Sequence, residues 1–258
     1  MSYSDILTNI DDAVLTLTIN RPDAGNKLRH QTCVELFDAL QKFRLDPALR
    51  VAVLTGAGDK FFCIGGEHDP ITSLDQSQVL PMVDLYQAID TIAKPVIAAV
   101  NGFAVGGGNV IHTVCDLTIA ADTAVFRQVG PMVGSFDAGY GSWYLEDTIG
   151  RKRAKEMWYL NRKYSAEQAR EMGLVNEVVP AADLATHVAE LAKDVAKRSP
   201  MALAGMKGAF SARHNGVAGQ ARMAHDQQLS LYLQTKEAHE LNTAFGERRA
   251  PDPGSFWS

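Results

Sequence analysis

The chain has 258 residues, of which 46% are hydrophobic and 21% charged, and its formal net charge is −5 at pH 7. This length can bury a sizeable core, and the composition is that of an ordinary globular protein. The acidic balance argues against a nucleic-acid-binding surface. No apolar run approaches the ~20 residues of a membrane span, and residues 1–5 lack the basic and apolar regions of a signal peptide. We therefore expect a cytoplasmic protein with no membrane and no nucleic-acid partner.

Strand-like and helix-like segments alternate through the first two hundred residues. The expected elements in chain order are strands over 6–10 and 13–19, a helix over 31–43, a strand over 51–56, a helix over 85–92, a strand over 94–100 and a helix over 109–115. Residues 67–80 are polar and turn-rich, as expected of a mobile flap over a substrate. Repeated strand–turn–helix units place their loops at strand ends, where α/β proteins bind ligands.

The pattern changes at Ser199, after which helices are expected over 200–211, 218–234 and 236–248, with no strand signal. We therefore divide the chain into a core of residues 1–198 and a C-terminal helical region of residues 199–258. The helices of this region carry more apolar side chains than one protomer needs, which predicts self-association.

Two glycine turns are the main candidates for a binding site. Gly106 to Gly108 stand before the helix over 109–115, where bare backbone N–H groups favour negative charge and allow a ligand to approach closely. Taken alone, this motif fits a tight packing turn equally well. A second turn, Gly65-Gly66, follows the strand over 51–56 after a short polar turn. Two such turns can supply the two converging N–H donors that stabilise a thioester enolate.

These motifs resemble those of the crotonase (enoyl-CoA hydratase/isomerase) superfamily. The matching segments run in family order over nearly the whole chain: 19–22, 54–59, 62–67, 106–108, 116–122 and 169–180. The resemblance implies an α/β fold built as a spiral of ββα units, with a C-terminal helical region for trimerisation and active-site cover. It also implies an acyl-CoA substrate, no covalently bound cofactor, a homotrimer or dimer of trimers, and oxyanion donors at Gly66 and Gly107.

Two positions argue against simple hydration of an enoyl-CoA. By the same resemblance, hydratases activate water between two glutamates, one just after the triple glycine and one twenty residues later. This chain has Val110 and Gly130 there, and neither side chain can move a proton.

The segment from Gln128 to Ser142 carries polar groups that could do the chemistry instead. Ser or Asp before a helix is often only an N-cap. However, this segment, with residues 155–160, 230–237 and 245–251, resembles the branch that contains 1,4-dihydroxy-2-naphthoyl-CoA synthase and 2-oxocyclohexanecarboxyl-CoA hydrolase. That resemblance implies catalytic roles for Ser135 and Asp137, with Tyr140 beside them and Tyr232 reaching the pocket from the C-terminal region.

Both reactions of this branch pass through a thioester enolate, one closing a ring and one opening it. The synthases have a longer flap that carries Arg and Tyr, whereas residues 67–80 contain neither, which favours the ring-opening hydrolase. Gln128, Gly130 and Trp158 match residues that hold bicarbonate in many synthases, but the same types occur in the hydrolase-like branch. A non-catalytic scaffold or binding protein is the alternative of another class. The acidic charge and the Ser135/Asp137 pair argue against it.

Several further residues are candidate contacts to the CoA substrate. They are Lys27 and Arg29 for the phosphates, Arg248 for the nucleotide across a subunit interface, Cys63 and Gly65 beside the oxyanion glycine, and His68 in the flap. A solvated loop is the alternative for the two basic residues near 28, and a surface position for the flap histidine. No metal site is expected, because no third ligand accompanies the i,i+4 pair formed by His112 and Asp116.

Overall fold

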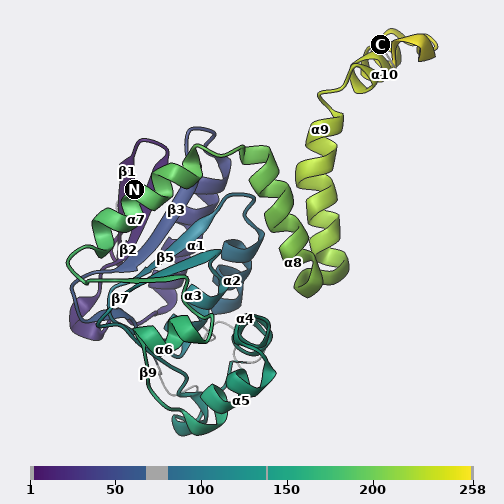
Figure 1. Cartoon of the computed structure of the whole chain (residues 1–258). Coiled ribbons are helices and arrows are strands. Elements are labelled where there is room, and N and C mark those ends of the chain that lie inside the picture. The colour runs from purple at the N-terminus through teal and green to yellow at the C-terminus, as the bar shows by residue number, and fades with distance from the viewer. Residues whose placement is uncertain (1–2, 68–80, 138, 257–258) are drawn as a thin grey trace. The chain divides into compact units, whose positions relative to one another are not determined.

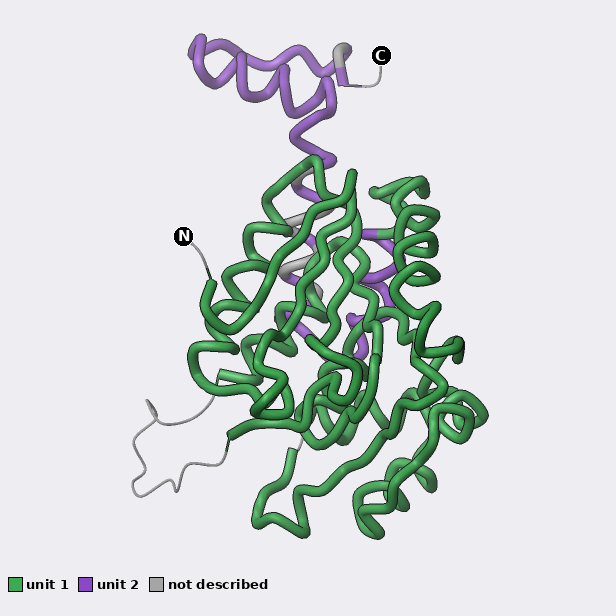
Figure 2. The backbone as a smooth tube through the Cα atoms, turned by 90° about the vertical axis from the view of Figure 1, so that its left-hand side faces the viewer, with its two compact units in different colours: residues 1–203 green, residues 204–258 purple. Residues whose placement is uncertain are grey.

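The computed structural model describes residues 3–67, 81–137 and 139–256 (Figure 1). The chain divides into two compact units, residues 1–203 and residues 204–258, which Figure 2 colours separately.

The first unit contains a six-stranded sheet in the order β1-β2-β3-β5-β7-β10. Its strands are β1 (Ile6–Asp11), β2 (Val14–Ile19), β3 (Val51–Gly56), β5 (Val96–Val100), β7 (Leu117–Ala121) and β10 (Glu177–Val179). β1 is antiparallel to β2, and all other neighbours in this sheet are parallel. The first strands therefore form the hairpin that the sequence predicts around Asp11 and Asp12.

A second sheet has the order β4-β6-β8-β9. It is formed by β4 (Phe61–Cys63), β6 (Phe103–Val105), β8 (Val125–Arg127) and β9 (Tyr164–Ser165). Each consecutive pair, β3/β4, β5/β6 and β7/β8, gives one strand to each sheet, and the first two pairs are followed by helices α2 (Met82–Thr91) and α3 (Gly107–Val114). The expected spiral of ββα units is thus confirmed.

Helices cover both faces of the six-stranded sheet. Val51 and Val53 of β3 pack in one cluster with α7 (Leu184–Ala196), while Ala52 and Leu54 pack in the main core with α1 (His30–Leu45). Because both faces are covered, β3 reads as a continuous apolar run rather than an alternating one. All three cysteines are buried within this main core.

The polypeptide that follows β8 builds the region around the candidate site. It contains short 3₁₀ and π turns at Gly130–Met132 and Tyr140–Tyr144, followed by α4 (Leu145–Ile149), α5 (Arg151–Leu160) and α6 (Ala166–Glu171). Positive φ angles at Gly134 and Gly139 mark the turns in this segment. These turns place Asp137 on a loop between the 3₁₀ and π turns rather than inside a helix.

The C-terminal part is helical, as the sequence predicts. α8 (Pro200–Met223) begins in the first unit and continues into the second, with a kink at Gly216, where φ is 52°. A π turn over Ala224–Leu229 leads into α9 (Ser230–Tyr232), and α10 (Lys236–Glu247) follows. The break expected between residues 211 and 218 is therefore a glycine kink. None of the described helices is long and apolar enough to cross a bilayer.

Candidate active site

The triple-glycine turn joins β6 to α3 and packs tightly against the end of β4. Gly106 has φ 55° and ψ −122°, a conformation that suits glycine, and Gly107 is the first helical residue. A side chain at Gly108 would overlap the carbonyl group of Cys63. The N–H of Gly107, at the first position of α3, has no acceptor within its own helix, so it can donate to a ligand.

The second glycine turn lies directly against the first. A Cβ on Gly65 would stand 3.2 Å from the backbone nitrogen of Gly107. Leu28 donates its N–H to the Gly65 carbonyl (2.9 Å) and accepts the Glu67 N–H (2.8 Å). The N–H of Gly66, which stands between Gly65 and Glu67, takes part in neither of these hydrogen bonds. The structure thus brings together the two glycine turns whose N–H groups the sequence predicts as oxyanion donors.

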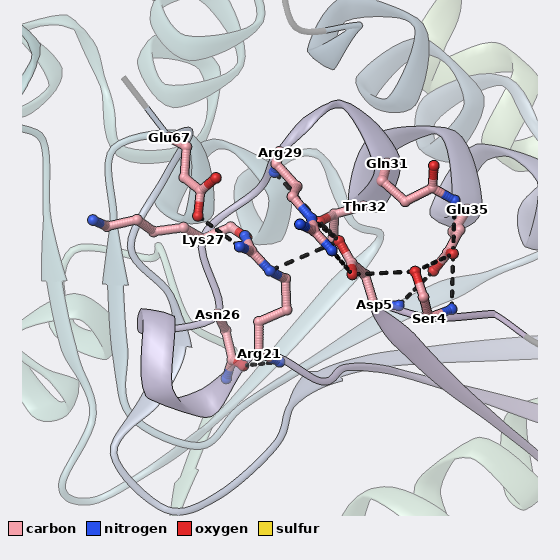
Figure 3. Close-up of polar contacts among 10 residues, drawn as sticks. All are labelled: Ser4, Asp5, Arg21, Asn26, Lys27, Arg29, Gln31, Thr32, Glu35 and Glu67. Carbon is pink, nitrogen blue, oxygen red and sulfur yellow. Dashed lines mark hydrogen bonds and ion pairs between the residues drawn. The ribbon is translucent and has the colours of Figure 1, made fainter. Parts of the chain in front are cut away.

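An arginine ties the Gly66 turn to the N-terminal part of the fold (Figure 3). The Arg21 guanidinium forms an ion pair with Glu67 (Nη2–Oε1 2.6 Å) and donates to the Lys27 carbonyl (2.6 Å). Its Nε also lies 3.7 Å from Asp5 Oδ2. Because Glu67 follows Gly66 directly, this ion pair restrains the backbone that presents the Gly66 N–H.

Asp5 is the centre of the same polar cluster and is only 2% exposed. Arg29 binds it in a bidentate ion pair (Nε–Oδ2 2.7 Å, Nη2–Oδ1 2.6 Å), and the Thr32 hydroxyl donates to Oδ2 (2.6 Å). These hydrogen bonds, that of Arg29 first, hold the pKa of Asp5 at about 2. A contact between Arg29 and a CoA phosphate, which the sequence predicts, would compete with this ion pair, so we do not propose Arg29 as a CoA ligand. Lys27, whose side chain extends away from Asp5 in Figure 3, stays a candidate.

The carboxylate of Asp137 is hydrogen-bonded to a tyrosine that sequence reasoning missed. The Tyr86 hydroxyl donates to Asp137 Oδ2 at 3.2 Å. It also lies 3.2 Å from where a Cβ of Gly107 would stand. The structure therefore joins Asp137 to Gly107 through one buried phenol. In the sequence Tyr86 stands in an apolar helix and looks like core, and its partner lies 51 positions further along the chain, so no local pattern indicates it.

Burial acts on the acid–base properties of both groups. It raises the pKa of Asp137, against the opposing effect of hydrogen bonds from Tyr86 and the Gly141 backbone. Burial, and next the nearby Asp137 charge, raises the pKa of Tyr86 well above its usual value. Tyr86 therefore remains a neutral hydrogen-bond donor. The pKa of the Asp137 carboxyl group is moved towards neutral pH, which is typical of proton-transfer sites.

Of the other predicted residues of this loop, Tyr140 lies beside the same pair and Ser135 is exposed. Ser135 is exposed, and its N–H donates to the Gly130 carbonyl at 2.9 Å. The Tyr140 ring lies 5.7 Å from the Tyr86 ring and stacks on Tyr144 at 5.1 Å. Tyr140 thus borders the Tyr86–Asp137 pair, while Ser135 lies on the exposed side of the loop.

Gln128, Gly130 and Trp158, which match a bicarbonate site in related synthases, are only partly suited to bind bicarbonate in this structure. Gln128 is 1% exposed, and neither polar atom of its side-chain amide has a hydrogen-bond partner. A buried amide in this state is suited to a small bound polar group. The Trp158 indole N–H, however, donates to the Gly141 carbonyl at 2.8 Å, and Gly130 packs against the Trp158 ring. An anion beside Gln128 would have to be held without the indole N–H, or displace it from Gly141.

Other expected site residues are not brought into this group. The Cys63 side chain is fully buried, and burial raises the pKa of its thiol to about 12; the expected contact of Cys63 with the substrate stays a prediction. His68 lies outside the described residues. Tyr232 and Arg248 belong to the second unit. Within the described residues, no three or more His, Cys, Asp or Glu side chains form a group that could hold a metal.

The hydratase glutamate positions are apolar in the structure as well. Val110 is buried on α3 and packs in the main core. Gly130 has no side chain, and a Cβ there would stand 2.7 Å from the Ser135 carbonyl oxygen. A carboxylate at either position would therefore need a different local backbone or core.

Comparison with known proteins shows the family to which this chain belongs. Residues 9–255 match the family model described as Enoyl-CoA hydratase/isomerase. Enoyl-CoA hydratase from Bacillus anthracis is 31% identical over 96% of this chain and 98% of its own, with a TM-score of 0.76. An enoyl-CoA hydratase subunit I from Geobacillus kaustophilus is 30% identical over 97% and 98%, with a TM-score of 0.76. A monofunctional enoyl-CoA isomerase from M. smegmatis is 30% identical over 85% and 98%, with a TM-score of 0.72. The chain therefore belongs to the enoyl-CoA hydratase/isomerase family, and it is an acyl-CoA-processing enzyme of the crotonase fold.

Proposed function

We propose that this enzyme acts on a carbon–carbon bond and opens the ring of a cyclic β-ketoacyl-CoA by hydrolysis. The observation that carries the proposal is the hydrogen bond between Asp137 and Tyr86, whose hydroxyl lies beside Gly107. The positions of the hydratase glutamates, Val110 and Gly130, offer no alternative acid or base. The proton-handling group at this site is then Asp137.

The proposed reaction uses two kinds of group: the carboxylate of Asp137, which moves protons, and the N–H groups of Gly66 and Gly107, which donate hydrogen bonds. Asp137 takes a proton from water as the water oxygen adds to the ring ketone carbon. The bond between that carbon and the α-carbon then breaks, and its electron pair moves into the thioester as an enolate. The enolate oxygen accepts hydrogen bonds from the N–H groups of Gly66 and Gly107, each contributing roughly 3–4 kcal/mol. Protonated Asp137 returns its proton to the α-carbon, and the ketone carbon becomes a carboxylic acid while the thioester survives.

The raised pKa of Asp137 supports this double role. A carboxyl group whose pKa is moved towards neutrality by burial is a better proton acceptor and still returns the proton. In this scheme Ser135 donates a hydrogen bond to the ring ketone and orients it. Lys27 and Arg248 are proposed contacts for the CoA phosphates, and Tyr232 is a proposed active-site residue from the C-terminal region.

A second candidate is the reverse sense of this chemistry, the Dieckmann-type closure catalysed by 1,4-dihydroxy-2-naphthoyl-CoA synthase. The unpartnered amide of Gln128 favours it, because such an amide is suited to hold bicarbonate. The indole N–H of Trp158, already donated to Gly141, does not add to that support. The absence of Arg and Tyr from residues 67–80 favours the hydrolase.

A substrate panel tests these alternatives directly. The enzyme is incubated with cyclic β-ketoacyl-CoAs, o-succinylbenzoyl-CoA and crotonyl-CoA, and the products are identified by mass. We expect a cyclic substrate to gain one water while keeping its CoA. Loss of water from o-succinylbenzoyl-CoA identifies the synthase, and preferred hydration of crotonyl-CoA contradicts the proposal. Binding of all the thioesters without turnover identifies a scaffold protein.

A further inference from the structure

Tyr86 is a polar side chain on an otherwise apolar helix face. It lies on α2, where Leu85 and Ile89 are core residues, and it is itself only 1% exposed. Burying a hydroxyl group costs free energy unless the group finds a hydrogen-bond partner. The partner here is a carboxylate oxygen that lies 51 positions further along the chain. A phenylalanine would fill the same space without that requirement, so packing alone does not account for the hydroxyl.

The Tyr86 hydroxyl lies between the carboxylate of Asp137 and the backbone of Gly107. Asp137 Oδ2 lies 3.2 Å away, and Met82 Sδ lies 4.0 Å away. A Cβ on Gly107 would stand 3.2 Å from the hydroxyl and would overlap the Met82 methyl group. The hydroxyl is therefore enclosed by Met82, the oxyanion glycine and the carboxylate.

Neighbouring aromatic rings also restrain Tyr86. Its ring lies 5.7 Å from the Tyr140 ring, and Tyr140 stacks on Tyr144 at 5.1 Å with an interplanar angle of 18°. Aromatic pairs at these separations stabilise one another beyond their burial. Tyr140 and Tyr144 belong to the π turn that follows Asp137, so these rings connect α2 to the loop that carries Asp137.

We propose that Tyr86 is the positioning residue of Asp137, holding its carboxylate at the Gly107 end of the oxyanion site. This inference rests on the proposed function of Asp137 as the proton-transfer group. Asp137 is on a glycine-rich loop, and its carboxylate accepts hydrogen bonds from the Tyr86 hydroxyl and the Gly141 backbone N–H. Tyr86 itself touches no reacting atom in this scheme.

The position of Tyr86 also sets the ionisation of Asp137. The hydrogen bond from Tyr86 opposes the rise in the Asp137 pKa that burial causes, so its removal raises that pKa further. Titratable groups of several elements lie around this pair and its neighbours: Cys33 on α1 and Cys63 on β4 act on Tyr86, and Asp90 on α2 acts on Tyr140 and Tyr144 of the π turn. Burial alone raises the pKa of Cys33 to about 12, so this thiol stays neutral in the range where Asp137 titrates.

The test compares Tyr86→Phe with the wild-type enzyme and with Tyr3→Phe. Tyr3 is a matched control, because its hydroxyl donates to a carboxylate, that of Asp38, at 2.7 Å. We expect Tyr86→Phe to lower kcat about ten- to hundredfold, the range for a lost hydrogen bond to a charged group, with KM little changed. The acidic limb of its pH–rate profile moves to higher pH. Tyr3→Phe leaves both kcat and this limb unchanged.

An infrared titration separates this inference from the proposed reaction, because it needs no substrate. The stretching band of protonated Asp137 is assigned by its absence from Asp137→Asn, and its loss is followed as pH rises. In Tyr86→Phe the band persists to higher pH than in the wild type. If the band shifts while no ring substrate is opened, the positioning role stands and the proposed function fails. A band that titrates at the same pH in both proteins overturns the positioning role.

Discussion

Asp137 is the side chain on which the proposed chemistry depends most. Asp137→Asn keeps the size of the side chain and removes the basic carboxylate, so we expect ring opening to fall about 10²–10⁴-fold, the range for general acid–base catalysis. Ser135→Ala removes only an orienting hydrogen bond and lowers the rate less. Steady-state kcat measures both, with circular dichroism as the check on folding. An Asn variant that retains a tenth of the wild-type rate would contradict the role of Asp137.

The oxyanion role of Gly107 can be tested with a matched pair of variants. Gly107→Pro removes the backbone N–H, whereas Gly107→Ala keeps it, and both add a side chain against the flexible end of Met82. Relative to Gly107→Ala, we expect Gly107→Pro to lower kcat roughly 10²–10³-fold. Equal rates in two correctly folded variants would exclude this N–H as a donor.

The amino-acid sequence indicates some site residues and misses others for physical reasons. Glycines in series and an Asp in a glycine-rich segment are local patterns, so Gly66, Gly107 and Asp137 could be predicted. Tyr86 could not, because a tyrosine in an apolar helix looks like core and its partner is distant in the chain. The sequence does not show the burial of Cys63, which stands two residues before Gly65 and ends strand β4. Arg29 is expected from the sequence as a CoA-phosphate contact, with a solvated loop as the alternative, and only the fold brings Asp5 to it.

At the scale of elements, long segments were predicted more accurately than short ones. The strand over 51–56 has the observed bounds, and the helix expected over 31–43 extends over His30–Leu45. Lys94 explains part of the extra length, because its Nζ donates to the carbonyls of Phe43 and Asp46 at the end of α1. The strands of the second sheet have two or three residues each and show no periodicity of their own. Only the family resemblance implied them.

The Asp5 cluster predicts how the stability of the N-terminal elements depends on pH. The pKa of Asp5 falls from 3.8 to about 2 on folding, so its contribution is complete above about pH 4 and is lost as pH falls through about 2. A shift of this size corresponds to about 2 kcal/mol of unfolding free energy.

Urea unfolding of the wild type and of Asp5→Asn measures this contribution. At pH 7 we expect Asp5→Asn to be less stable by about this amount or more, because Arg29 loses its ion-pair partner. Below pH 2 the two proteins should converge. If the difference in unfolding free energy between the two proteins is the same at pH 7 and below pH 2, the ionised Asp5–Arg29 pair does not cause that difference.

At the scale of the whole molecule, the C-terminal unit has large apolar side chains on its surface. The exposed ones are Met206, Phe210, Val217, Leu229, Leu231, Leu233 and Phe245. So many exposed apolar groups mark an interaction surface, because their burial stabilises association. We expect light scattering to give three or six times the chain mass of 28.0 kDa. A stable, active monomer would contradict this prediction.

The overall architecture could be predicted further than its details. The repeated units and the change to helices after Ser199 gave the spiral core and the helical end. The helix break expected between residues 211 and 218 is present at Gly216, whose φ of 52° and ψ of −138° are not helical and separate two helical segments.

The central claim is that water attacks the ring ketone and leaves the thioester intact. Hydrolysis of a cyclic β-ketoacyl-CoA in H₂¹⁸O, followed by mass spectrometry of the product and its fragments, tests it most directly. The account predicts one ¹⁸O atom in the newly formed carboxylate of an acyl-CoA that still carries its CoA. The same ¹⁸O-labelled product should form 10²–10⁴-fold more slowly with Asp137→Asn than with the wild type. Label that appears together with free CoA, as in thioester hydrolysis, would contradict the account.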